Sequence, residues 1–173
     1  MNGRRSFGIA FVMLSLALVV PATAESQQRA LKEQLIGAWI LVSNNNTLPD
    51  GTKRELWGPN PKGILILDPS GRYAQTQMRS NRAKFKSGNR LQATPEESRT
   101  AMQESLAQFG TWSVDEPTKT ITLNIEGSVF PNSEGNRSRR VILGLTADEL
   151  RVTNPGPSAG GKSEAVFRRA TGQ

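Results

Sequence analysis

Residues 35 to 44 read LIGAWILVSN, an apolar run in which a glycine stands two residues before a tryptophan. Successive side chains of an extended strand point to opposite faces, so Gly37, Trp39 and Leu41 share one face. We expect this face to point inward, with Trp39 filling the narrow end of a small β-barrel and Gly37 leaving space for the indole ring. The alternative is that Trp39 is an ordinary core tryptophan of another β fold.

A buried indole needs a partner for its N–H, and a cation laid over the ring suits it electrostatically. The last expected strand, residues 163–170, contains Arg168 and Arg169 near its end. In a closed barrel the last strand lies beside the first. One of these arginines is therefore expected to cover Trp39 from outside the barrel floor, and we assign this structural role to Arg168.

Short apolar and polar runs separated by turn-forming residues continue to the C-terminus, a pattern typical of all-β proteins. Strands are expected at residues 35–43, 53–57, 63–67, 72–79, 109–115, 120–126, 139–145, 150–153 and 163–170. Most neighbours are joined as hairpins, which favours a single up-and-down antiparallel barrel of eight to nine strands. Thr94, Pro95 and Glu97 form a capping box that begins one flanking helix, at about residues 94–108.

The N-terminus has the features of a secretory signal peptide. Arg4 and Arg5 precede the apolar run of residues 7–20, and a small-x-small pattern ends at Ala24. The run is shorter than the roughly 20 residues of a membrane-spanning helix. Cleavage after Ala24 leaves 173 − 24 = 149 residues and lowers the formal charge from +7 to +5, because two arginines leave. We expect a periplasmic or secreted domain over residues 25–173 with no integral membrane segment. The sequence leaves open whether the general secretory or the twin-arginine route exports it.

The chain has neither histidine nor cysteine. Disulfides, a thiol nucleophile, His-dependent catalytic triads and the usual zinc, copper and haem ligand sets are therefore excluded. We expect no metal and no cofactor. Any catalysis would use Asp, Glu, Lys, Arg or the single tyrosine, and the best candidates are Tyr73, Arg79 and Glu126.

Several stretches resemble a known family. They are LIGAWILVSN, then LWGPNPKGILILDPSGRYAQTQMRSNR from residue 56, the segment TPEESRTAMQ to RRVIL over residues 94–143, and the terminal AVFRRA. Together they cover nearly all of residues 31–170, and their order and spacing resemble the bacterial lipocalin-like domain family. The resemblance implies a lipocalin-like barrel. Members often carry histidines on the strand that matches residues 120–126, and this chain has none, so histidine chemistry does not carry over.

A barrel of this size has room for one small ligand, and we expect a small hydrophobic or amphipathic molecule. Val141 is also expected to point inward. Loops 44–62, 80–93 and 127–137 are expected to shape the entrance. The candidate ligand-binding residues are Leu41, Trp57, Ile66, Tyr73, Arg79, Trp112, Leu123, Ile125 and Phe130.

Other interpretations stay open. Residues 73, 75, 77 and 79 share one polar face of their strand, and we favour an outward orientation because polar faces usually meet water. The basic segment 79–90 is interpreted as a solvated loop rather than as an anion-capturing surface. With only Phe85 to stack on a base, it does not indicate nucleic-acid binding. The alternative functions are a cofactor-free isomerase or cyclase and a structural or interaction module with a solid core. The sequence does not indicate the oligomeric state.

Overall fold

The computed structural model describes residues 30–171 of the 173-residue chain, and the predicted signal peptide lies outside them. Nine strands form one antiparallel sheet in the order β2-β1-β3-β4-β5-β6-β7-β8-β9. The strands are β1 (Gly37–Thr47), β2 (Lys53–Glu55), β3 (Lys62–Leu67), β4 (Arg72–Met78), β5 (Ser105–Asp115), β6 (Thr120–Ser128), β7 (Arg137–Leu145), β8 (Glu149–Asn154) and β9 (Lys162–Arg169).

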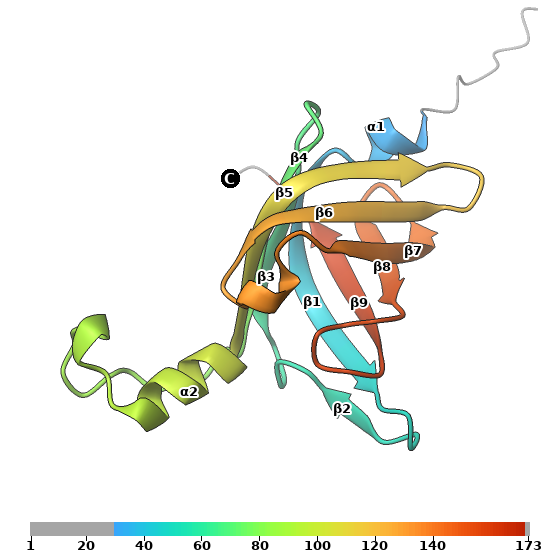
Figure 1. The fold of residues 1–173 in the computed structure, drawn as a ribbon. Coiled ribbons are helices and arrows are strands. Elements are labelled where there is room, and N and C mark those ends of the chain that lie inside the picture. The colour runs from blue at the N-terminus through green and yellow to red at the C-terminus, as the bar shows by residue number, and fades with distance from the viewer. Residues whose placement is uncertain (1–29, 172–173) are drawn as a thin grey trace, which may run out of the picture.

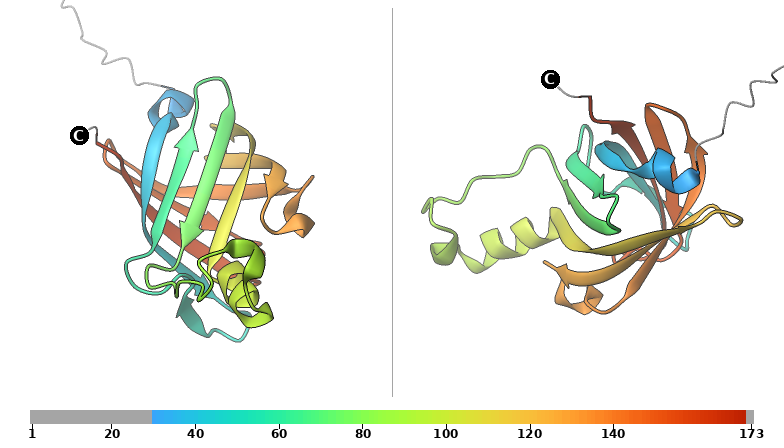
Figure 2. Two further views of the ribbon diagram at one scale, coloured as in Figure 1. Left: turned by 90° about the vertical axis from the view of Figure 1, so that its left-hand side faces the viewer. Right: turned by 90° about the horizontal axis from the view of Figure 1, so that it is seen from above.

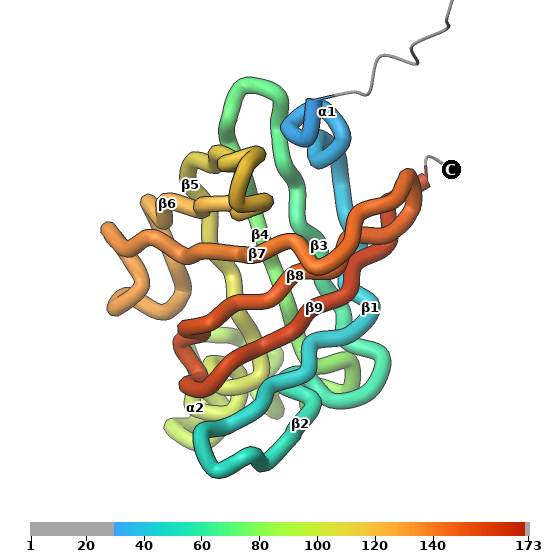
Figure 3. Tube along the Cα trace, turned by 90° about the vertical axis from the view of Figure 1, so that its right-hand side faces the viewer, coloured from blue at the N-terminus to red at the C-terminus, as the bar shows by residue number. Residues whose placement is uncertain are grey.

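The sheet closes on itself because β1 also pairs with β9, along residues 39–47 and 162–169 (Figure 3). Eight strands therefore form a closed barrel, and the short strand β2 extends the sheet at the far end of β1 (Figure 1). The predicted up-and-down antiparallel barrel is confirmed. Closure leaves the long strands without free edges, which suits a chain that has no disulfides.

Two α-helices lie at opposite ends of the barrel: α1 (Leu31–Leu35) at one end and α2 (Pro95–Gln103) at the other, where it projects away from the strands (Figures 1 and 2). Two 3₁₀ turns, η1 (Arg90–Gln92) and η2 (Pro131–Ser133), lie in the connections at the α2 end. No helix of residues 30–171 has both the length and the apolar character to cross a membrane.

Helix α2 begins as predicted but ends earlier than residue 108. The Thr94 hydroxyl accepts a hydrogen bond from the Glu97 N–H, and the Glu97 carboxylate accepts one from the Thr94 N–H. The predicted extension to residue 108 is wrong, because β5 already begins at Ser105. Gln108 is buried on the inner face of β5, where strand pairing with β4 takes precedence over helical continuation.

Strand β1 contains a β-bulge between Leu41 and Ser43. The extra residue, Val42, is exposed. A bulge shifts the side-chain alternation by one position, so Asn44 and Asn46 become the buried residues of the second half of the strand. The bulge therefore divides β1 into an apolar half that contains Trp39 and a polar half.

Trp39 closes one end of the barrel, as predicted. Its side chain is fully buried, and its Nε1 donates to the Leu35 carbonyl oxygen at 2.8 Å. The guanidinium that covers the indole belongs to Arg169, with Cζ 4.0 Å from the ring centroid. The assignment to Arg168 is wrong, because that side chain is exposed on the outer face of β9.

Arg169 also connects three segments of the chain by hydrogen bonds. Its Nη2 and Nη1 donate to the carbonyl oxygens of Gln34 and Ile36, at 2.7 and 3.0 Å, and its Nε donates to the Ala147 carbonyl oxygen. Gly37 has φ +128°, and a Cβ there would lie 3.1 Å from Arg169 Nη1. The glycine is thus required for its backbone conformation and for the passage of the guanidinium, rather than for the indole itself.

Candidate ligand-binding cavity

A cavity of about 260 Å³ occupies the end of the barrel opposite Trp39. Its walls are inward-facing side chains of β1, β3 to β9, and its rim is formed by residues 56–57, 130–136 and 156–159. Loops 44–62 and 127–137 were predicted to shape the entrance, and both contribute residues. Loop 80–93 contributes none, and the β8–β9 loop at 156–159 takes its place.

The polar face of β4 points into the barrel, so the predicted outward orientation is wrong. Gln75 and Gln77 are both buried and both line the cavity. The amide oxygen of Gln77 accepts hydrogen bonds from Asn44 Nδ2 at 2.8 Å and from Trp57 Nε1 at 2.6 Å. These bonds hold the Trp57 ring at the rim of the cavity and make this part of the lumen a network of amides.

The single tyrosine lies one alternation deeper on β4. The side chain of Tyr73 is 3% exposed, and its hydroxyl makes no hydrogen bond of good geometry, although Gln108 lies near it. Burial raises the pKa of Tyr73 to about 12, and the nearby charge of Arg140 opposes this rise. The phenol is therefore a neutral hydrogen-bond donor at neutral pH.

Arg140 on β7 is the charged residue of the lumen, and the sequence analysis did not identify it. It is paired in register with the buried Ile121 of β6 and lines the cavity. Its Nη1 donates to the Ser138 hydroxyl and, at 3.2 Å, to the Arg139 carbonyl oxygen. Burial lowers the pKa of Arg140 to about 10, so the guanidinium is still cationic at neutral pH.

The remaining wall of the cavity is apolar. It is formed by side chains from β3, β6, β8 and β9, and at the rim by Phe130 and Leu56. The buried members are Leu65, Ile121, Ile125, Val152, Ala165 and Phe167. A ligand in this cavity would therefore meet apolar surface on one side and amides and a guanidinium on the other.

The predicted ligand-binding residues fall into three groups. Trp57, Ile125 and Phe130 line the cavity. A second group is buried in the core and does not belong to the cavity wall; it consists of Leu41, Tyr73, Trp112 and Leu123. Ile66 was expected to point inward, and this is wrong: it lies on the outer face of β3 and is 40% exposed. Val141 is likewise exposed on the outer face of β7.

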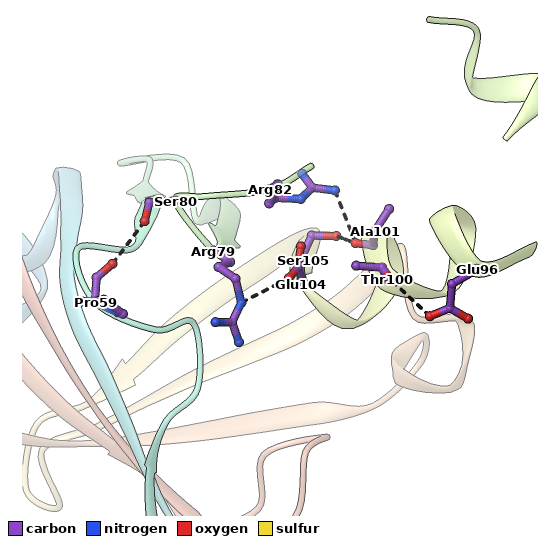
Figure 4. Close-up of polar contacts among 9 residues, drawn as sticks. All are labelled: Pro59, Arg79, Ser80, Arg82, Glu96, Thr100, Ala101, Glu104 and Ser105. Carbon is purple, nitrogen blue, oxygen red and sulfur yellow. Dashed lines mark hydrogen bonds and ion pairs between the residues drawn. The ribbon is translucent and has the colours of Figure 1, made fainter. Parts of the chain in front are cut away.

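Arg79 lies just beyond the end of β4, outside the lumen. Its Nε is 3.2 Å from Glu104 Oε1, and both residues lie at the base of α2 (Figure 4). Arg79 borders a shallow outer depression that it shares with Trp57, Phe130 and Met102. Its guanidinium is therefore placed to meet a molecule at the rim and does not reach into the cavity.

The neighbouring basic segment is exposed, as predicted for a solvated loop. Arg82, Lys84, Lys86 and Arg90 all face solvent. The loop is attached to the rest of the chain by few contacts, which include Arg82 Nη2 to the Ala101 carbonyl oxygen at 3.3 Å and Ser80 Oγ to the Pro59 carbonyl oxygen at 3.1 Å (Figure 4).

Glu126, the carboxylate considered for proton transfer, lies outside the barrel. Its Oε1 is 2.7 Å from Arg72 Nη1, and both side chains are about half exposed. Among the described residues, no aspartate or glutamate lines the cavity. The cavity therefore offers hydrogen bonds, the guanidinium of Arg140 and, at the rim, that of Arg137, but the proposed carboxylate base cannot act inside it.

A closed meander of eight antiparallel strands, sealed at one end by a tryptophan–arginine pair and hollow at the other, defines a lipocalin-like barrel. The sequence agrees with this class: the model of the lipocalin-like domain family matches residues 36–168. The chain belongs to this family, as its sequence resemblance indicated. None of the curated proteins matches the chain in sequence.

Solved structures with related folds include natural and designed barrels. A lipocalin-like protein from Bacteroides uniformis is 16% identical, with 79% of this chain and 99% of that chain covered and a TM-score of 0.41. A de novo designed fluorescence-activating β-barrel is 14% identical, with 80% and 96% covered and a TM-score of 0.42. A redesigned β-barrel is 12% identical, with 81% and 95% covered and a TM-score of 0.43. The family assignment rests on the match to the family model.

Proposed function

We propose that this protein binds a small hydrophobic or amphipathic molecule in the open end of its barrel. The observation that carries the proposal is the cavity of about 260 Å³, enclosed by strands on all sides and reached past Trp57 and Phe130. Ligand sites of this kind are concave, mostly apolar and equipped with a few fixed polar groups. The cavity also argues against the alternative of a barrel packed solid throughout.

The arrangement of the core supports the same proposal. Trp39, Leu35, Leu67 and their neighbours fill the closed end and stabilise the barrel there. Because this packing stabilises the barrel at the closed end, the open end is left free to hold a ligand. Affinity would come from burying the apolar body of the ligand against Ile125, Val152 and Phe167.

The test uses N-phenyl-1-naphthylamine, an uncharged probe whose emission rises in apolar surroundings. Saturable binding to the wild-type protein is expected. Ala165→Phe should abolish it by filling the cavity, since Ala165 is buried in the cavity wall. Ala74→Phe is the matched control, because Ala74 is exposed on the outer face of β4. Absence of saturable binding to the wild type, or equal loss in both variants, contradicts the proposal.

We also propose that the protein is exported, on the strength of the predicted signal peptide over residues 1–24. The domain that would be delivered contains no cysteine and is held together by packing and strand closure. Mass spectrometry of the protein from a fractionated bacterial host should give a chain that begins at Glu25 in the periplasmic or secreted fraction. A full-length chain confined to the cytoplasm contradicts export.

A further inference from the structure

Arg140 is half-buried in the wall of the cavity, and among residues 30–171 it has no counter-ion. None of the ion pairs among residues 30–171 involves it, and no carboxylate of this part of the chain lines the cavity. A guanidinium has five N–H donors, yet the two protein hydrogen bonds of Arg140 both come from Nη1. A guanidinium that is partly removed from water and has unused N–H donors favours the arrival of an anion.

A second unsatisfied group lies in the core behind the cavity wall. The Tyr73 hydroxyl is shielded from solvent and makes no hydrogen bond, and it is close enough to Arg140 for the two groups to influence each other electrostatically. Tyr73 lies on the inner face of β4, one alternation below Gln75 and therefore towards the closed end. The Tyr73 hydroxyl lies in the core and the Arg140 guanidinium lines the cavity, so Arg140 is the donor that a ligand in the cavity can reach.

The cavity around Arg140 suits the apolar body of an amphipathic molecule. Besides Arg140, the cavity is lined by apolar side chains such as Ile125 and Val152 and by the amides of Gln75 and Gln77, and Gln77 binds Trp57 at the rim. Arg137, exposed on the rim, adds a second positive charge along the way in. The positive charges of Arg137 at the rim and Arg140 inside would therefore attract an anion from the opening into the cavity.

We propose that the lumen binds an amphipathic carboxylate head first, with its carboxylate against Arg140 and its apolar body directed towards Trp57. This inference rests on the proposed binding function and names the chemical class of the ligand. Charge-assisted hydrogen bonds to a carboxylate are stronger than neutral ones, so the preference is for the acid over the matching alcohol.

The experiment compares dodecanoate and dodecanol as displacers of N-phenyl-1-naphthylamine at pH 8. In the wild type, dodecanoate is expected to bind at least about tenfold more tightly than dodecanol, as one or two charge-assisted hydrogen bonds would give. Arg140→Gln should remove this preference for dodecanoate over dodecanol.

Arg139→Gln is the matched control, because it removes one charge from the adjacent, outward-facing position of β7; it should keep the preference. Arg140→Met is a second variant for the case in which the glutamine variant does not fold. Replacing this half-buried charge by an apolar side chain should likewise remove the preference.

The outcomes separate the two proposals. If the naphthylamine does not bind the wild type, the proposed function fails and this inference fails with it. If the naphthylamine binds but dodecanoate and dodecanol displace it equally, or if Arg139→Gln lowers the preference as much as Arg140→Gln, the lumen site stands and the anion inference is overturned.

Discussion

Replacing Trp39 by alanine tests the closed end of the barrel. A tryptophan buries up to about 250 Å² of surface, which at about 25 cal/mol per Å² corresponds to about 6 kcal/mol for the whole side chain. Alanine retains part of this, and the ring is fully enclosed, so the expected loss is about 3–5 kcal/mol. The Leu35 carbonyl oxygen and the Arg169 guanidinium also lose their partner.

A loss of this size is a large fraction of the total stability of about 5–15 kcal/mol that is usual for a single domain. Urea unfolding followed by far-UV circular dichroism measures it, and Trp39→Phe is the graded variant, with a smaller loss because a ring still fills the space. A loss below about 0.5 kcal/mol for Trp39→Ala is the size expected of a surface substitution. That result would refute the placement of Trp39 in the closed end.

Three further predictions concern other charged and polar groups. Arg169→Gln should cost about 2 kcal/mol or more in urea unfolding, because it removes a cation from the Trp39 ring and breaks up to three hydrogen bonds, whereas the exposed Arg168→Gln should cost less than about 0.5 kcal/mol; equal effects would contradict the assignment. Tyr73 is the single tyrosine, so absorbance at 295 nm should show one phenol that titrates with a pKa of about 12 in the folded protein and about 10 in urea. Since the folded state holds this proton more tightly, stability should fall as the pH rises from about 10 towards 12, and a folded-state midpoint near 10 would show that the phenol is exposed. Glu126→Gln should change stability by less than about 1 kcal/mol and leave naphthylamine affinity unchanged, and a large loss of binding would place that carboxylate in the lumen after all.

The barrel and its closed end were predictable because they depend on local patterns. Alternation of side chains put Trp39 on the inner face, and short turns between strands gave the meander its order. The choice between Arg168 and Arg169 depended on the exact register of β9 against β1. Strand β1 pairs Trp39 with Arg169, and this register is set by strand closure rather than by a local pattern.

The polar lumen was harder to predict, for two physical reasons. A bulge at Val42 reverses the alternation, so the buried positions of Asn44 and Asn46 do not follow from Trp39 by counting. On β7, placing Val141 inward forced Arg140 outward, although Arg140 shares its face with Ile142, which is buried. If Ile142 is taken as the core residue of that strand, the alternation of side chains places Arg140 in the lumen as well.

The orientation of β4 shows the limit of the rule that polar faces meet water. Gln75 and Gln77 are tolerated inside because amide groups in the lumen bind one another. Asn44 of β1 binds Gln77 of β4 across the intervening strand β3, and Gln108 of β5 binds Gln75 of the adjacent β4. These partners are 33 residues apart in both pairs, so no short segment of sequence contains both members.

The central claim is that a ligand occupies the end of the barrel opposite Trp39. Its most direct test is quenching of tryptophan emission by 12-bromododecanoate, because bromine quenches only indoles that it approaches closely. With its carboxylate at the base of the cavity, the bromine should lie near Trp57, so saturable quenching in the wild type should be largely lost in Trp57→Phe. Quenching that persists undiminished in Trp57→Phe would mean that the molecule binds near Trp39 or Trp112, or on the outer surface, and would contradict the account.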